Sequence, residues 1–155
     1  MFATPLGFGA ETTGLRPRVD HTRYPVAVFN EFVAIAAERV GPEKTRRLLG
    51  SELDDTYLVV EVSIYPRGRN TIDVKPGEFF LRVNRTREIV HSSMPGAVVV
   101  ESRSRALPET VAHKPVAGYL YFQVAEKRSG NYEYELEYKG QGHWMIIPLQ
   151  AASAK

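Results

Sequence analysis

The stretch that decides the fold is YEYELEY, at residues 132–138. Tyrosine or leucine occupies every second position, and glutamate occupies the positions between. Successive side chains of a β-strand point to opposite faces, so this alternation predicts a strand with one buried and one solvated face. The same two-residue period predicts another strand over residues 56–65, TYLVVEVSIY.

Outward from these two strands, short alternating segments recur between turns that contain glycine or proline. They predict strands over residues 78–84, 97–102, 117–125 and 143–149, and a short extended piece over residues 70–74. Residues 28–40 fit either an amphipathic helix or a strand, and the strands that follow favour a strand. Pro42 and Gly50 bracket a short predicted helix. Seven or eight short strands predict an all-β fold, an immunoglobulin-like antiparallel β-sandwich.

The 155 residues suit one domain, with a sandwich over residues 28–150 and a frayed tail over residues 151–155. Residues 1–27 are predicted to form an extended N-terminal arm, because glycine and proline interrupt them too often for a helix or a central strand. The arm packs on its own domain, docks on another subunit or is disordered. Docking would make its large apolar side chains partner-binding groups: Phe2, Leu6, Phe8, Leu15 and Tyr24.

Composition narrows the function classes. The chain has 20 basic and 18 acidic residues, a balance that argues against a dedicated nucleic-acid binder. It has no cysteine, which excludes disulfides, thiol nucleophiles and thiolate metal sites. No apolar window is long enough for a transmembrane helix, so no transmembrane segment is expected. The first residues lack the pattern of an intact signal peptide, and Met1 is compatible with the start of a mature form.

Two stretches carry a family resemblance. The first holds LLG at 48–50, YLVVEV at 57–62 and FFL at 79–81, and the second holds AGYLYF at 117–122 and YEYEL at 132–136. Together they resemble immunoglobulin-like, telokin-like accessory domains of exported bacterial proteins. The resemblance implies an antiparallel sandwich and a periplasmic or extracellular location, while a cytoplasmic location stays open. It transfers no catalytic residue, because such domains share no active site.

Side chains that could act in catalysis or metal binding are scattered along the sequence. The four histidines, His21, His91, His113 and His143, form no metal-binding motif. Glu133, Glu135 and Glu137 share one predicted strand face, and we interpret them as a solvated face rather than as paired catalytic acids. No serine lies in a nucleophile elbow. We therefore expect no enzymatic activity, no cofactor and no metal.

The aromatic residues of the last strands are the most informative group. Tyr132, Tyr134 and Tyr138 share a face with Leu136, which predicts that this face belongs to the core. Tyr119, Tyr121 and Trp144 are the better candidates for exposure and partner binding. We expect a structural or interaction subunit of a larger bacterial assembly or cell-envelope complex. Its partner would be another protein or a second copy, bound through the arm and the sheet edges. A carbohydrate- or ligand-binding module using exposed aromatics is the alternative.

Overall fold

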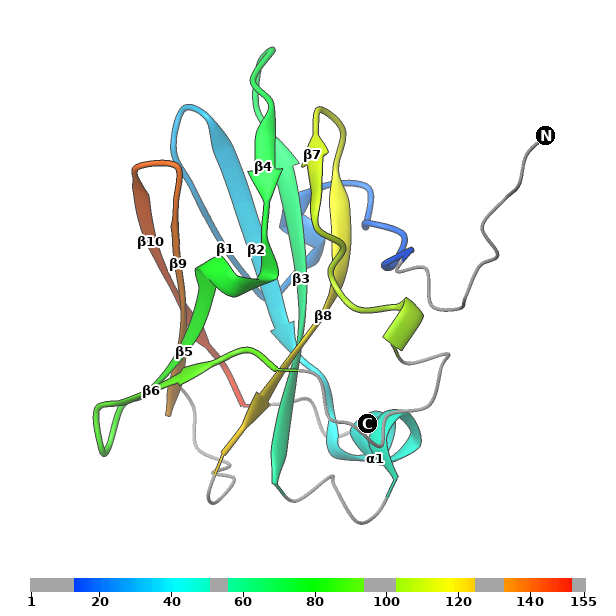
Figure 1. The fold of residues 1–155 in the computed structure, drawn as a ribbon, viewed down its shortest axis with the longest axis vertical. Coiled ribbons are helices and arrows are strands. Elements are labelled where there is room, and N and C mark those ends of the chain that lie inside the picture. Colours follow the sequence, from blue (N-terminus) through cyan, green and yellow to red (C-terminus); the bar gives the residue numbers. More distant parts are fainter. Residues whose placement is uncertain (1–12, 51–55, 94–102, 125–132, 152–155) are drawn as a thin grey trace, which may run out of the picture.

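The computed structural model describes residues 13–50, 56–93, 103–124 and 133–151. They form two antiparallel β-sheets packed face to face, which confirms the predicted all-β sandwich (Figure 1). The predicted strand over residues 97–102 and the arm residues Phe2, Leu6 and Phe8 lie outside the described residues. No helix among the described residues is both long and apolar enough to cross a membrane.

Each of the two main sheets has four strands. The first sheet contains, in spatial order, β1 (Val26–Phe29), β2 (Val33–Arg39), β3 (Tyr57–Pro66) and β8 (Val116–Gln123). The second sheet contains β10 (His143–Leu149), β9 (Tyr134–Gly140), β5 (Phe79–Val83) and β6 (Glu88–His91). A separate ribbon pairs β4 (Ile72–Val74) with β7 (Thr110–Ala112). The helical elements are η1 (His21–Arg23), α1 (Pro42–Leu49) and η2 (Pro76–Glu78).

The core lies between the two main sheets. Leu58, Val60 and Val62 of β3 face Tyr134 and Leu136 of β9 across it, with Tyr138 in the same cluster. The predicted core face of the YEYELEY stretch is therefore confirmed for its described residues. Edge strands of the two sheets also meet, because Ser93 of the segment after β6 donates its backbone N–H to the carbonyl of Tyr121 at 2.8 Å.

The ambiguous segment is resolved into two strands. β1 ends at Phe29 and β2 begins at Val33, so the strand interpretation is confirmed for residues 28–29 and 33–39, whereas residues 30–32 form a turn that was not predicted. Between them, the Asn30 side-chain oxygen accepts hydrogen bonds from the backbone N–H groups of Phe32 at 2.8 Å and Val33 at 2.9 Å. The asparagine thus replaces ladder hydrogen bonds at a tight turn.

The predicted helix over residues 42–49 is confirmed as α1. Pro42 occupies its first position, where a missing N–H costs nothing. Gly50 ends it at a φ of 87°, and its N–H bonds to the carbonyl of Arg46 at 2.7 Å. Leu48 and Leu49 of the helix then pack on the outer side of the first sheet.

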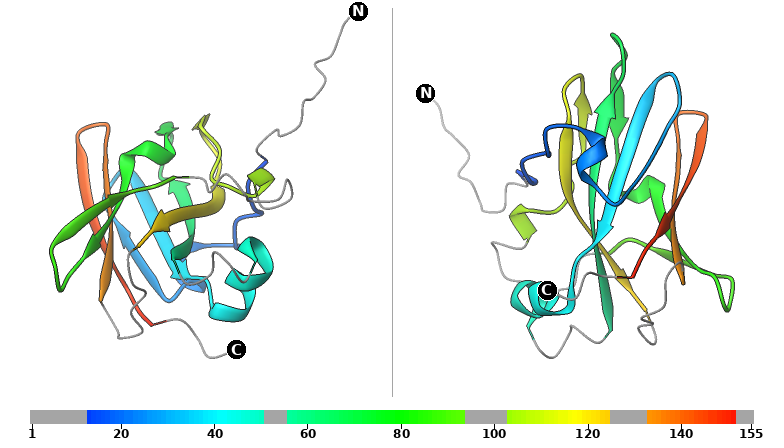
Figure 2. Two further views of the ribbon diagram at one scale, coloured as in Figure 1. Left: turned by 60° about the horizontal axis from the view of Figure 1, so that its bottom comes forward. Right: turned by 180° about the vertical axis from the view of Figure 1, so that it is seen from behind.

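The outer side of the first sheet is covered, as Figure 2 shows, by residues 13–25, by α1 and by the segment 103–107. Beneath this layer Tyr119 is 1% exposed and Tyr121 is 2% exposed. Their expected exposure is therefore wrong. Both tyrosines point away from the sandwich core, as their alternation requires, but Leu48, Leu49 and Ala106 cover them.

The described part of the arm packs on its own domain. Leu15 bonds through its N–H to the carbonyl of Ala117 at 2.8 Å and packs beside the tyrosine cluster. Tyr24 is 6% exposed and lies against Ala34 and Ala36 of β2, with its hydroxyl donating to Glu61 at 3.1 Å. Tyr24 therefore does not present its ring to another subunit.

Candidate interaction surface

The outer face of the second sheet, here called the open face, has no described element over it (Figures 1 and 2). Strand register brings three cross-strand rows together on this face. They are Trp144 with Lys139; Ile146, Glu137, Phe80 and His91; and Pro148, Glu135, Arg82 and Ile89. Trp144 is 64% exposed, so its predicted exposure is confirmed, and Ile89 and Ile146 are also exposed. The open face therefore joins apolar and charged groups on one exposed surface of the sheet.

A buried carboxylate lies at the centre of the open face. Glu137 is only 1% exposed, and Arg82 donates a hydrogen bond from Nε to Glu137 Oε2. The Trp144 indole donates to Glu137 Oε1 at 3.3 Å, and the Lys139 amino group lies 3.9 Å from the same oxygen. The interpretation of all three glutamates as a solvated face is therefore wrong for Glu137. Side chains from β5 and β10 cover it, and their position could not be inferred from β9 alone.

The electrostatics of this carboxylate follow from its neighbours. Burial alone would raise the pKa of Glu137, but the hydrogen bond and positive charge of Arg82 outweigh burial, and Trp144 and Lys139 add to their effect. The pKa of Glu137 therefore lies below its ordinary value, and the group is ionised at neutral pH. A carboxylate held ionised among hydrogen-bond donors is a structural anchor. A general acid would need a raised pKa.

This anchor fixes the exposed tryptophan. Its hydrogen bond to Glu137 holds the indole across β9, and the Lys139 ammonium lies 5.4 Å from the ring centroid. The same ammonium lies 5.9 Å from the Phe80 ring. A large aromatic side chain that is both exposed and already ordered loses little conformational entropy when it binds. Such residues are typical anchors of binding surfaces.

Charge is unevenly distributed along β9. Lys139 lies near one end of the strand and Glu135 lies nearer the other, with Glu137 between them. Because Arg82 neutralises Glu137, the remaining charges give the open face a positive end and a negative end.

His91 and His143 lie in different parts of the structure and do not form one site. His91 packs edge-on against Phe80 at 5.0 Å, on the open face, whereas His143 contacts Phe32 at 5.3 Å beside the β1–β2 turn. Within the described ranges, no three acidic or histidine side chains gather as metal ligands.

Of the sequence-predicted binding residues that the structure describes, only Trp144 lies on the open face. Phe80, Arg82, Lys139 and Ile146 were not predicted. A signal existed for Phe80 and Arg82, which occupy the outward positions of the predicted strand over residues 78–84.

Comparison of the sequence with protein-family models and with curated proteins gives no match. Solved structures do show similar folds. The ycdA protein of Bacillus subtilis, described as a candidate lipoprotein, is similar over 81% of this chain at 19% identity and a TM-score of 0.52. The yjhA protein of the same organism is similar over 82% of this chain and 98% of its own, at 17% identity and a TM-score of 0.54. MPT63, a secreted protein of Mycobacterium tuberculosis, covers 78% of this chain and 88% of its own, at 10% identity and a TM-score of 0.49.

The chain spans 38% of the length of ycdA. At identities below 20%, the two Bacillus structures establish a shared fold and nothing finer. The chain thus has an antiparallel β-sandwich fold that also occurs in a protein described as a candidate lipoprotein.

Proposed function

We propose that this chain is a non-enzymatic interaction module of an exported bacterial assembly, and that its open face binds a second copy of the chain. The observation that carries the proposal is Trp144, 64% exposed and held across the sheet by the buried Glu137. An exposed aromatic side chain that is already ordered loses little conformational entropy when it binds a partner. This favours a binding role for Trp144.

The composition of the open face favours a protein partner. Tryptophan and arginine are the residues most enriched among those that dominate binding energy at protein interfaces, and Trp144 and Arg82 lie next to the same carboxylate. Exposed Ile89 and Ile146 extend the apolar area around them. Burial of such branched aliphatic side chains against another protein removes apolar surface from water, which stabilises the complex.

The charges favour a second copy as the occupant. A twofold axis in the plane of the open face, crossing β9 near Glu137, would reverse the direction of the strand in the partner copy. Lys139 of each copy would then oppose Glu135 of the other. An isologous contact would in this way pair the positive end of one face with the negative end of its mate.

The size of the face predicts a weak association. The strands β10, β9, β5 and β6 have 7, 7, 5 and 4 residues. At about 4.8 Å between strands and about 3.4 Å rise per residue, they give roughly 380 Å² of area, which side-chain relief enlarges. Stable interfaces bury about 800 Å² per partner. The dissociation constant of the dimer is therefore expected in the micromolar range. Small changes in local concentration would then control how much dimer forms.

The export assignment rests on two supports. The first is the resemblance of the sequence to telokin-like accessory domains of exported bacterial proteins. The second is the fold shared with ycdA. Fractionation of the native host, with the full-length gene product detected by antibody, tests this part of the proposal. Recovery only from the cytoplasm would contradict it.

Sedimentation velocity over a micromolar to millimolar concentration series tests self-association. We expect a monomer–dimer equilibrium in which Trp144→Ala raises the dissociation constant by about 30-fold, the effect of losing about 2 kcal/mol. Val111→Ala is the matched control, because Val111 is 65% exposed on β7, away from the open face. A wild-type chain that stays monomeric, or equal weakening by both variants, would refute the proposed contact.

A carbohydrate is the second candidate ligand, because an exposed indole beside Arg82 and Lys139 could stack on a sugar ring and bond its hydroxyls. Trp144 is the only tryptophan, so its fluorescence during titration with soluble glycans reports this directly. A saturable response with a monomeric protein would favour the carbohydrate over the second copy.

A further inference from the structure

Four turns form one end of the sandwich, here called the tip. They are residues 30–32 between β1 and β2, 67–71 between β3 and β4, 113–115 between β7 and β8, and 141–142 between β9 and β10. Figure 1 shows all four at the upper end of the molecule, and the view from behind in Figure 2 agrees. Hydrogen bonds tie them together, since Arg67 Nη1 donates to the carbonyl of Asn30 at 2.7 Å and Gln141 Nε2 donates to the carbonyl of Asp73 at 3.2 Å. The tip therefore has contributions from both main sheets.

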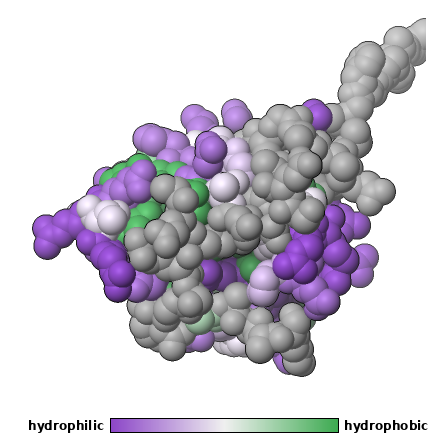
Figure 3. Space-filling model, turned by 90° about the horizontal axis from the view of Figure 1, so that it is seen from below, coloured by the Kyte–Doolittle hydropathy of each residue, from purple (hydrophilic) through white to green (hydrophobic). Residues whose placement is uncertain are grey.

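The charge of the tip is positive. Its four turns carry three basic side chains and one acidic side chain, all exposed, which gives a net charge of +2 with neutral histidines: Arg67, Arg69, Lys114 and Glu31. The opposite end differs in its apolar groups. Figure 3 views that end, where hydrophilic side chains gather around α1, and the two leucines of α1 are buried.

The tip also exposes two phenylalanines, one on each flank of its first turn. Phe29 is 60% exposed and Phe32 is 39% exposed. The guanidinium carbon of Arg67 lies 4.9 Å from the centroid of the Phe29 ring, and the His21 ring lies 5.9 Å from it. The Phe32 ring lies 5.3 Å from the ring of His143. Both rings are thus ordered by neighbours while much of their surface faces water.

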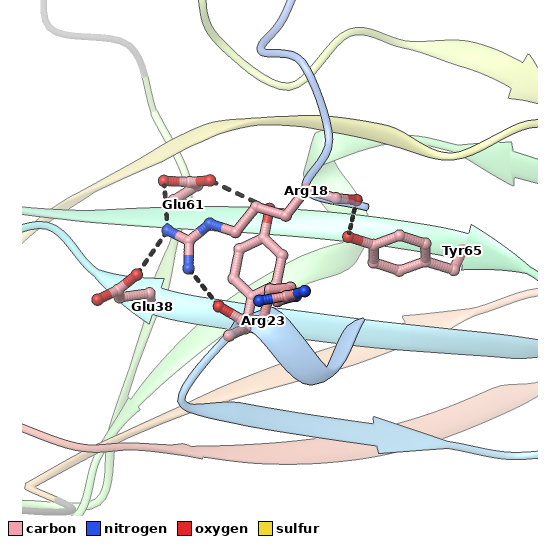
Figure 4. A network of polar contacts seen from close by, with 6 residues as sticks. Arg18, Arg23, Glu38, Glu61 and Tyr65 are labelled. Carbon is pink, nitrogen blue, oxygen red and sulfur yellow. Dashed lines mark hydrogen bonds and ion pairs between the residues drawn. The ribbon is translucent and has the colours of Figure 1, made fainter. Parts of the chain in front are cut away.

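The segment that carries His21 is itself held against the first sheet. Arg18 Nη2 lies 2.6 Å from Glu38 Oε1 and 3.2 Å from Glu61 Oε1, as Figure 4 shows. The Tyr65 hydroxyl donates to the carbonyl of Arg18 at 2.9 Å, and the Tyr65 ring lies 6.1 Å from the ring of His21. The aromatic side of the first turn is therefore supported by contacts fixed to the domain.

We infer that the tip binds the surface of an anionic lipid bilayer. Phe29 and Phe32 enter the headgroup region, where aromatic side chains are favoured, and the three cations lie against the negative headgroups. Each cation near an anionic membrane strengthens binding about fivefold. A bilayer accepts apolar side chains from uneven turns without a complementary shape, whereas a folded protein would need one, and this favours the bilayer. The inference uses no residue of the open face.

Co-sedimentation of the full chain with phosphatidylglycerol vesicles, against phosphatidylcholine vesicles, tests the inference. We expect binding to the anionic vesicles alone, weakened by added salt. Phe29→Ala should weaken it about tenfold, because the exposed ring no longer leaves water. Ile89→Ala is the matched control, since Ile89 is 43% exposed on β6, and it should change binding less than about twofold.

A pair of double variants tests the cations. Arg69→Gln/Lys114→Gln should weaken binding at least about tenfold. Arg85→Gln/Arg87→Gln removes two exposed cations from the β5–β6 turn, at the lower end in Figure 1, and should weaken it far less. Far-UV circular dichroism checks that every variant is folded.

A fluorescence measurement tests whether the first turn enters the bilayer. Trp144 is the only tryptophan, so Phe29→Trp in a Trp144→Phe background places a single reporter at the tip. Its emission should shift to shorter wavelength with phosphatidylglycerol vesicles and stay unchanged with phosphatidylcholine vesicles. Absence of vesicle binding, as for a tip that serves a protein partner, would overturn the inference. Binding without the emission shift, or binding that the control variants weaken as much as the tip variants, would also overturn it.

Discussion

Replacement of Tyr24 tests whether the described part of the arm is a structural component of the domain. Tyr24→Ala removes a ring that is buried against Ala34, Ala36 and Tyr65, and it removes the contact with Arg18, whose guanidinium carbon lies 4.0 Å from the ring centroid. Truncating a buried aromatic to alanine costs about 3–5 kcal/mol. We expect the lower limit, about 3 kcal/mol, because Tyr24 belongs to the covering segment 13–25, which can move toward the sheet and close part of the gap.

Tyr24→Phe separates the ring from its hydroxyl. It keeps the packing and removes only the hydrogen bond to Glu61, so the expected loss is about 1 kcal/mol. Val19→Ala is the control within the same segment, because Val19 is exposed, and its effect should stay within about 0.5 kcal/mol.

Urea unfolding followed by far-UV circular dichroism measures these differences in the free energy of unfolding. For a chain of this length, Tyr24→Ala should also lower Tm by about 6–12 °C. The reasoning would be refuted if Tyr24→Ala changed stability no more than Val19→Ala, since the arm would then contribute nothing to the fold. It would also be refuted if Tyr24→Phe cost as much as Tyr24→Ala.

Two further predictions concern the sheets. Because the pKa of Glu137 is lowered in the folded state, its pairing with Arg82 stabilises the protein fully above the ordinary value of 4.5 and is lost as pH falls through the folded value. The stability difference between wild type and Arg82→Gln, measured by urea unfolding from pH 7 to pH 3, should therefore shrink with acid; a constant difference would contradict the pairing. In Gly118→Ala the new Cβ would lie 2.3 Å from the backbone of Leu107, so thermal unfolding should show a loss above about 2 kcal/mol, against little change for Gly77→Ala, whose Cβ would meet no atom within 4 Å. Equal effects of the two alanines would argue against the close approach of the segment 103–107 to β8.

Patterns within short stretches of sequence correctly predicted two long strands and the helix. The two-residue period located β3 and β9, since in both strands one face must lie in the core. Pro42 and Gly50 located α1, because their backbone preferences act wherever the rest of the chain lies. β6 and β7 were missed because they are short and mostly exposed, so neither shows buried alternation.

The candidate surface was harder to predict, because burial of a strand's second face depends on what covers it. Tyr119 and Tyr121 alternate as regularly as Glu135 and Glu137 do, yet α1 and the segment 103–107 cover the tyrosines. The residue types held a clue, since aromatic outward positions indicate a covered sheet and charged ones an open sheet. Trp144 was the exception that identified the open face.

The burial of Glu137 could not be predicted from the sequence of its own strand. Its neighbours in sequence match those of Glu135, but it is buried because Arg82 and Trp144 reach it from β5 and β10. Arg82 is separated from Glu137 by 55 positions, and their pairing follows from the register of β5 against β9. Register of this kind is set by the whole sheet and by the core beneath it.

The most direct test of the open face as a self-association surface is a charge-reversal rescue followed by sedimentation velocity. Lys139→Glu and Glu135→Lys should each weaken the dimer, because each places like charges opposite one another across the twofold axis. The double variant Glu135→Lys/Lys139→Glu should restore the wild-type dissociation constant to within about threefold, since each new lysine then opposes a new glutamate. A double variant that dimerises no better than the two single variants, with all three folded by circular dichroism, would contradict the proposed contact.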